Sequence, residues 1–200
     1  MSLQETKSWD IIEKGIVQLI QCCNNGGCDF TTDILAGIHS LSKPLNRAII
    51  SERSSISGAA IELVTTLSQR LGPSFEPLLS LFISTLLGLC ARTNKVFTKR
   101  AKECVFAVIR DTQSPSILPY LAESASHKSA SVRLVAAEGV LAYLNSFKTP
   151  AIKITTHLAR LLGDVMKSTL RDVSADVRKA GAKIFEIYKT LLPHRVERLV

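Results

Sequence analysis

Cysteines and histidines are the residues of this chain best suited to metal binding or catalysis, so their spacing is considered first. Cys22, Cys23 and Cys28 lie close together, but no second pair of cysteines or histidines follows at the spacing of a zinc site. The four histidines are far apart and form no His-x-x-x-His pair on one helical face. The Gly26-Gly27 pair lacks the strand and the lysine of a phosphate-binding loop. We therefore expect no metal, no cofactor and no enzymatic activity, and we interpret the cysteines as reduced, buried thiols.

Charge and composition limit the remaining classes of function. The chain has 200 residues with 25 Lys and Arg against 17 Asp and Glu, a net charge of +8 that favours an acidic partner. Its basic residues are spread over the sequence without an aromatic stacking platform, so we expect no nucleic-acid partner. The longest apolar stretch, residues 78–90, is too short to span a bilayer, so we expect a soluble protein with no membrane partner.

Leucine, isoleucine and valine recur at helical spacing almost throughout, which predicts an all-α chain. Aromatic residues make up only 6% of the sequence, and strict alternation is rare, so a strand-rich barrel is disfavoured. We expect helices over 7–22, 30–49 with a bend or restart at Pro44, 57–71, 75–91, 96–110, 116–125, 131–145, 151–170 and 176–192.

An internal repeat indicates how these helices pack. Segments 95–101, 131–137 and 176–182 superpose without gaps, and residues 53–60 form a weaker fourth copy. A spacing of ~40 residues between successive copies is typical of HEAT repeats, which are pairs of antiparallel helices. We therefore predict an α-solenoid of HEAT-like helix pairs, organised as a single array over residues 1–200. The expected repeats are roughly 1–27, 28–72, 73–113, 114–149 and 150–193, followed by a C-terminal stub.

Each of the three superposed segments places an alanine five residues after a valine. Two helices can approach closely where a small residue lies at their crossing. We therefore expect Ala101, Ala137 and Ala182 to be buried at helix crossings.

Turns within the repeats are the remaining candidates for a binding surface. In a solenoid such turns follow one another along one edge, so residues distant in sequence come together. The edge expected here is mostly basic and comprises Trp9, 51–54, 93–95, 127–129 and 171–174.

Four runs of sequence in these regions resemble the TOG domains of the CLASP family of microtubule-associated proteins. They are SERSSISGAA at 51–60, LGPSFEP at 71–77, LLGLCARTNKV at 86–96 and HKSASVR at 127–133. The resemblance is clearest over about 29–144 and weaker over the whole chain. It implies a paddle of HEAT-like repeats whose turns bind tubulin, in a plus-end regulator that stabilises microtubules by favouring pause and rescue. It also implies a monomeric domain in the cytoplasm, on cytoskeletal microtubules and the spindle.

The same resemblance implies which residues contact tubulin. In TOG domains the first turn usually carries a tryptophan followed three residues later by an arginine; here Trp9 matches, and Ile12 stands where the arginine would be. Carried over position by position, the tubulin-binding residues are Trp9, Arg53, Ser54, Asn94, Lys95, Lys128 and Arg171.

Each residue also has a structural interpretation that the sequence leaves open. Trp9 is either an exposed anchor or a core aromatic, and Arg53 either contacts a partner or pairs locally with Glu52. Lys95 and Lys128 are either contacts or ordinary solvated charges. Arg133 and Arg178 follow valines at helix starts, and we interpret them as structural. The alternative function is a HEAT-repeat scaffold that binds another acidic protein.

Overall fold

The computed structural model describes residues 3–146 and 155–191, and within these ranges it contains helices and no strand. The predicted all-α class is therefore confirmed. The chain divides into two compact units, Met1–Ser114 (unit 1) and Pro115–Val200 (unit 2). Each unit is described by itself, and the single array over residues 1–200 stays a prediction.

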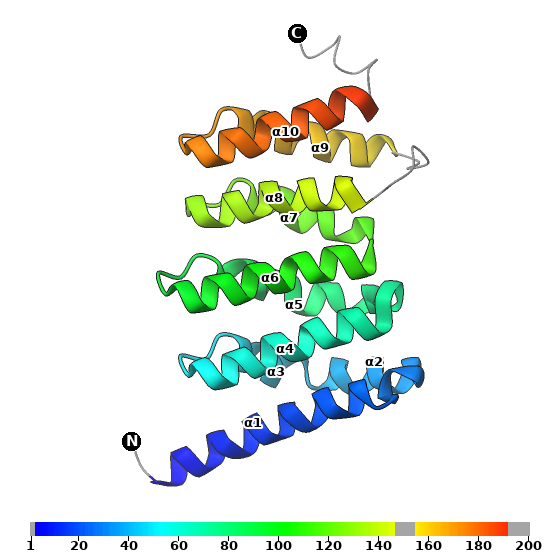
Figure 1. Cartoon of the computed structure of the whole chain (residues 1–200), viewed down its shortest axis with the longest axis vertical. Helices are drawn as coiled ribbons and strands as arrows, with labels where there is room; N and C mark the ends of the chain where they lie inside the picture. The colour runs from blue at the N-terminus through cyan, green and yellow to red at the C-terminus, as the bar shows by residue number, and fades with distance from the viewer. Residues whose placement is uncertain (1–2, 147–154, 192–200) are drawn as a thin grey trace. The chain divides into compact units, whose positions relative to one another are not determined.

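Unit 1 consists of two layers of helices (Figure 1). Helices α1, α4 and α6 form one layer, and α2, α3 and α5 lie behind them. The elements in chain order are α1 (Leu3–Asn24), η1 (Gly27–Asp29), α2 (Thr31–Ser40), α3 (Ser42–Ile49), α4 (Ser54–Leu71), η2 (Gly72–Phe75), α5 (Glu76–Leu89) and α6 (Lys95–Thr112).

Unit 2 repeats the same arrangement with fewer helices. Helices α8 and α10 lie in one layer and α7 and α9 in the other (Figure 1). Its elements are η3 (Pro115–Ile117), α7 (Leu118–Ser124), α8 (Ala130–Ser146), α9 (Thr156–Leu170) and α10 (Ala175–Leu191). The predicted start of a helix at Ala151 lies outside the described residues.

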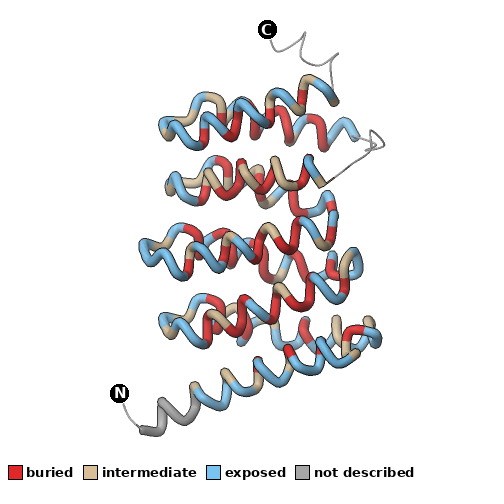
Figure 2. Tube along the Cα trace, viewed as in Figure 1, coloured by how far each residue is buried: buried red, intermediate tan, exposed pale blue. Residues whose placement is uncertain are grey.

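The core of unit 1 lies between its two layers, where the buried positions of Figure 2 concentrate. Helix α5 supplies much of it, through Leu78, Leu79, Phe82, Ile83, Leu86, Leu87 and Leu89. The stretch Ser54–Leu89 is long and apolar enough to cross a membrane by composition alone. It consists of α4 and α5, which η2 separates, and the apolar side chains of both helices pack inside unit 1.

Helix α4 begins three residues earlier than the sequence suggested, at Ser54 instead of Ser57. Arg53 precedes it with an extended backbone at ψ 111°. Ser57 lies inside the first turns of the helix, buried, and its hydroxyl donates a hydrogen bond to the Ile49 carbonyl at 2.7 Å. Ser57 therefore does not open the helix but ties it to the end of α3.

Burial of the predicted crossing residues differs among the three alanines. Ala101 and Ala137 are fully buried, as expected. Ala182 is exposed, so the prediction that it is buried was wrong, and its neighbour Gly181 is buried instead. A Cβ atom on Gly181 would lie 2.9 Å from the Leu170 nitrogen, so α10 approaches the backbone of α9 at this glycine.

The error comes from the register of the repeat alignment. In each copy the third residue of the helix and the residue four positions later are buried; the pairs are Ile56 and Ala60, Phe97 and Ala101, Val132 and Ala136, and Val177 and Gly181. Superposing Val96 on Val132 and Val177 shifted one copy by one residue, and Val96 is itself 48% exposed. The alignment therefore counted five residues from the valine where four are needed. Because one residue corresponds to about 100° of helical rotation, this count selected Ala182 on the solvent face in place of the buried Gly181.

Candidate functional site

Four helix pairs, α3–α4, α5–α6, α7–α8 and α9–α10, are each connected by one short turn, and we call these four turns the intra-pair turns. Turns 50–53 and 90–94 belong to unit 1, and turns 125–129 and 171–174 belong to unit 2. Within unit 1 both turns and the start of α1 lie at the same side, and within unit 2 both turns again lie together (Figure 1). We call these groups the first edge and the second edge.

Trp9 and Arg53 contact each other in the first edge. The Arg53 guanidinium lies over the indole ring of Trp9, 5.5 Å from the ring centroid, and both residues are partly buried. A guanidinium over tryptophan is a favourable cation–π arrangement. One face of the Trp9 ring is therefore covered by Arg53, and Ile12, at the usual arginine position, is 40% exposed.

Arg92 ties the two turns of the first edge together. Its guanidinium donates a hydrogen bond to the Ile50 carbonyl and pairs with the Glu52 carboxylate at 3.1 Å. It also lies 5.2 Å from the centroid of the Phe97 ring. Nearby, Arg100 of α6 donates to the Ser54 carbonyl of α4 at 2.8 Å. These two arginines were not among the predicted site residues, because their targets are backbone carbonyls in other repeats.

Asn94 and Lys95 are exposed where α6 begins. The Asn94 side chain accepts a hydrogen bond from the Val96 nitrogen at 2.9 Å, so this residue is the N-cap of α6. Within the described residues the Lys95 ammonium has no ion-pair partner. Val96 is 48% exposed beside it, so the first edge presents a cation next to an apolar side chain.

Arg133 holds the second edge together. Its guanidinium forms a two-pronged ion pair with Asp172, at 2.6 and 2.9 Å, and both side chains are nearly buried. It also donates to the carbonyls of His127 and Lys128, at 2.9 and 3.1 Å. Turns 125–129 and 171–174 are therefore fastened to each other through one side chain. The ion pair with Arg133 lowers the pKa of Asp172 below its ordinary value.

Arg178 plays the equivalent role in the next repeat. It occupies the same helical position in α10 as Arg133 in α8, and it donates to the Asp172 and Val173 carbonyls at 2.7 and 2.9 Å. The Asp172 carboxylate in turn accepts a hydrogen bond from the Ser174 nitrogen at 2.7 Å. The structural interpretation of both arginines is confirmed.

Lys128 and Arg171 are exposed on the intra-pair turns of unit 2. Their backbones take part in the turns, while in the described parts of the chain neither side chain has an ion-pair partner. Val173, between Asp172 and Ser174, is 88% exposed. The second edge therefore also combines cations with an exposed apolar side chain.

The thiols are poorly suited to catalysis. Cys23, Cys28, Cys90 and Cys104 are buried, but Cys22 is exposed, so the interpretation of its thiol as buried was wrong. Burial raises the pKa of Cys23 and of Cys104 to about 12, and that of Cys90 to about 11, so these thiols stay protonated at neutral pH. Among the described residues no group of three or more His, Cys, Asp or Glu side chains is arranged to hold a metal ion.

The arrangement of helix pairs defines the class of protein. The fold matches the structure from "Structural Basis of Microtubule Plus End Tracking by XMAP215, CLIP-170 and EB1" with a TM-score of 0.65 and 18% identity, over 82% of this chain and 71% of the other. It matches the MAST/Orbit N-terminal domain with a TM-score of 0.61 and 14% identity, over 92% and 79%. The chain therefore has the HEAT-like, all-α solenoid fold of a TOG domain.

The family follows from the sequence of the whole domain. Residues 3–200 match the family described as CLASP N terminal, and the chain belongs to that family. It is similar to the CLIP-associated protein of Arabidopsis thaliana, with 27% identity over 81% of this chain and 11% of that protein. Protein STU1 of Chaetomium globosum is 21% identical over 97% of this chain and 18% of its own length. The chain thus spans less than a fifth of the length of either relative.

The structure brings the predicted site residues together within each unit. Trp9, Arg53, Ser54, Asn94 and Lys95 belong to the first edge, and Lys128 and Arg171 to the second. The sequence interpretation did not name the exposed apolar residues of the edges, Ile50, Val96 and Val173, as site residues. An apolar residue inside a short polar turn, such as Val173 within Arg-Asp-Val-Ser, was the signal that could have identified them.

Proposed function

We propose that this chain is a tubulin-binding module that contacts tubulin or microtubules through the intra-pair turns of its two edges. The observation that carries the proposal is the set of Lys95, at the start of α6, and Lys128 and Arg171, on turns, all exposed and without ion pairs among the described residues. Because the tubulin surface is strongly acidic, such cations attract and orient it. Family membership supports the same function.

Apolar contacts supply the part of the affinity that charges do not. An exposed ion pair contributes about 0.2–1 kcal/mol, so a few lysines alone bind weakly. Trp9, Ile50 and Val96 on the first edge and Val173 on the second provide apolar surface beside the cations. In this proposal Ser54 and Asn94 contribute polar contacts, and Arg53 acts through its position on Trp9.

The proposed context is a longer microtubule regulator. The CLASP resemblance supports a protein that stabilises microtubules through pause and rescue, in the cytoplasm and on the spindle. One similar structure concerns microtubule plus-end tracking, and another, from "Crescerin uses a TOG domain array to regulate microtubules in the primary cilium", concerns microtubule regulation. The alternative, a scaffold for another acidic protein, uses the same edges with a different partner.

Co-sedimentation of the full chain with microtubules tests the proposal. The variant Lys95→Glu/Lys128→Glu replaces attraction by repulsion, so we expect less protein in the pellet. Its thermal midpoint stays near that of the parent because exposed turn residues contribute little packing. The matched control Lys43→Glu/Lys183→Glu makes the same change of charge at exposed helix positions outside the turns. Equal loss in both variants, or none in either, contradicts the proposed site, and competition by duplex DNA would favour a nucleic-acid binder.

A further inference from the structure

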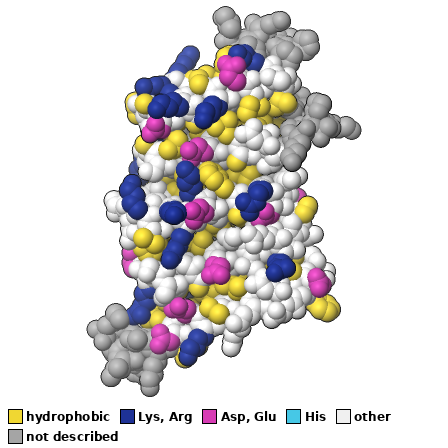
Figure 3. All heavy atoms as spheres, viewed as in Figure 1, with side chains coloured by type: hydrophobic (Ala, Val, Ile, Leu, Met, Phe, Trp, Pro, Cys, Tyr) yellow, Lys and Arg dark blue, Asp and Glu magenta, His cyan; other side chains and the backbone are white. Residues whose placement is uncertain are grey.

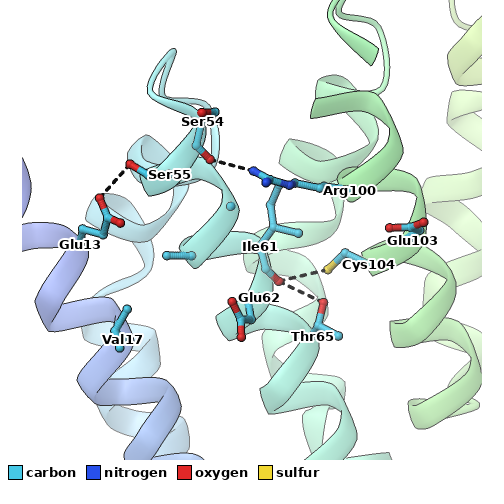
Figure 4. Close-up of a pocket in the computed structure, with 12 residues that line it drawn as sticks. Glu13, Val17, Ser54, Ser55, Ile61, Glu62, Thr65, Arg100, Glu103 and Cys104 are labelled. Atoms are coloured by element: carbon cyan, nitrogen blue, oxygen red, sulfur yellow. Dashed lines mark hydrogen bonds between the residues drawn. The ribbon is translucent and has the colours of Figure 1, made fainter. Parts of the chain in front are cut away.

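Unit 1 contains a groove of about 510 Å³ across the layer formed by α1, α4 and α6. Figure 4 shows α4 as its floor, with α1 on one side and α6 on the other. The groove has no part in the proposed tubulin contacts except that Ser54 and its carbonyl lie at one end. Its residues all belong to unit 1.

Short side chains on α4 create the hollow. Ser55, Gly58 and Ala59 face the groove where longer residues would fill the space between α1 and α6. A Cβ atom on Gly58 would lie 2.6 Å from a guanidinium nitrogen of Arg100, which crosses one end of the groove and donates to the Ser54 carbonyl. The remaining surface is largely apolar and comes from Val17, Ile61 and Cys104.

Each of the three helices contributes one glutamate to the rim: Glu13 from α1, Glu62 from α4 and Glu103 from α6 (Figure 4). Glu13 accepts a hydrogen bond from the Ser55 hydroxyl at 2.8 Å, and Glu103 lies 3.9 Å from the exposed Lys99 ammonium. Glu62 is exposed and has no ion pair in the described part of the chain. Three carboxylates thus surround an apolar floor, and Figure 3 shows acidic side chains interspersed with Lys and Arg on this face of the molecule.

We propose that this groove binds a lysine- or arginine-containing segment of a partner protein in an extended conformation. A long cationic side chain matches both parts of the groove, because its methylene groups cover Val17, Ala59 and Ile61 while its charge reaches Glu62 and Glu103. The Arg100 guanidinium has further N–H groups that can donate to a carbonyl of the segment backbone. Charge complementarity favours this occupant, since three carboxylates border the groove and Glu62 has no ion pair among the described residues.

Titration of the ¹⁵N-labelled full chain with a short peptide of alternating lysine and alanine tests this assignment by nuclear magnetic resonance. We expect the largest shift changes in the amides of residues 54–65 and little change with a peptide that carries glutamate in place of lysine. In Glu62→Gln/Glu103→Gln the dissociation constant rises about three- to tenfold, the effect of losing two exposed charge pairs. Failure of the lysine peptide to shift these amides in the parent protein overturns the proposal.

Two further variants separate groove binding from general attraction. Glu123→Gln/Asp164→Asn removes the same charge from exposed positions of unit 2, so its affinity should equal that of the parent. Ser55→Phe fills the groove and keeps all three glutamates, so it should also weaken binding. Equal weakening in the unit 2 control, or unchanged binding in Ser55→Phe, contradicts a groove site. Microtubule co-sedimentation of the groove variants should match the parent, which keeps this test independent of the tubulin proposal.

Discussion

Arginines in this domain show that a basic residue on a turn is not necessarily a binding residue. Arg92, Arg133 and Arg178 donate to turn carbonyls, and Arg133 is further neutralised by Asp172. They fix the shape of the edges because a guanidinium can bond several oxygens in one plane. Among the described residues of the turns and the helix starts that follow them, Lys95, Lys128 and Arg171 are exposed cations without an ion pair, so they are available to a partner.

The Arg133–Asp172 pair predicts how stability depends on pH. The contribution of this pair to the free energy of unfolding is complete above the pKa of an aspartate in the unfolded chain, about 4. It is lost as the pH falls through the lowered pKa of Asp172 in the folded protein. Arg133→Met should therefore cost about 2 kcal/mol at neutral pH and progressively less below pH ~4, as measured by urea unfolding. Lys179→Met, which removes the exposed pair with Asp176, should change little. A constant cost down to pH ~2 would contradict this assignment.

Gly181 and Ala182 test the corrected register of the repeat. Gly181→Ala places a Cβ atom 2.9 Å from the Leu170 nitrogen, so we expect it to destabilise unit 2 by about 1–3 kcal/mol. Ala182→Leu adds a larger side chain to an exposed position and should stay within about 0.5 kcal/mol of the parent. Thermal unfolding measures both.

The control for this pair is Gly15→Ala. No atom lies within 4 Å of its added Cβ, so the alanine should stabilise α1 by about 0.5–1 kcal/mol through helix propensity. Destabilisation by Ala182→Leu equal to that by Gly181→Ala would restore the original alignment.

Helix starts are the elements that give the edges their geometry. Helices α4, α6, α8 and α10 each begin directly after an intra-pair turn and bury their third residue. The side chain one position later fastens the preceding turn in three of them, through Ser57, Arg133 and Arg178. Helix α6 differs, since its fourth residue, Thr98, bonds to the Lys95 carbonyl inside the helix, and Arg92 in the preceding turn bonds back to Ile50 in turn 50–53.

The start of α6 carries a prediction that separates capping from binding. Asn94→Ala removes the bond to the Val96 nitrogen and should destabilise the domain by about 1 kcal/mol. Asn94→Ser keeps a good cap, so its free energy of unfolding should remain near that of the parent. If Asn94→Ser nevertheless pellets less with microtubules, Asn94 contacts tubulin; if it pellets as the parent does, capping is its only role.

Sequence reasoning predicted the helices well because their apolar spacing is local. It placed the end of α4 at Leu71 and the turn at Asn94 correctly. It did not find the one-residue register shift at Val96, because Val96 and Phe97 are both apolar and only packing decides which is buried. It also missed Arg92 and Arg100, whose partners lie more than 40 residues away in sequence.

On the scale of the whole molecule, charge is distributed unevenly in a way that net charge conceals. The chain carries +8, yet many arginines are engaged with carbonyls or carboxylates, and the groove of unit 1 is lined by glutamates. The two proposed partner surfaces differ accordingly: cationic and apolar turns for an acidic partner, and a groove lined by glutamates for a basic segment.

Salt dependence distinguishes the charged and apolar parts of the edges. Raising salt from ~0.01 M to ~0.1 M shortens the screening length from ~30 Å to ~10 Å, so we expect microtubule binding by the parent chain to weaken several-fold. Lys95→Glu/Lys128→Glu removes much of the attraction and should give weaker binding with a flatter salt dependence. Val96→Ser/Val173→Ser should lower the affinity at every salt concentration with the slope unchanged, because apolar contacts are not screened. Co-sedimentation across this range measures all three, and binding by the parent that does not respond to salt would exclude the lysines as the main contacts.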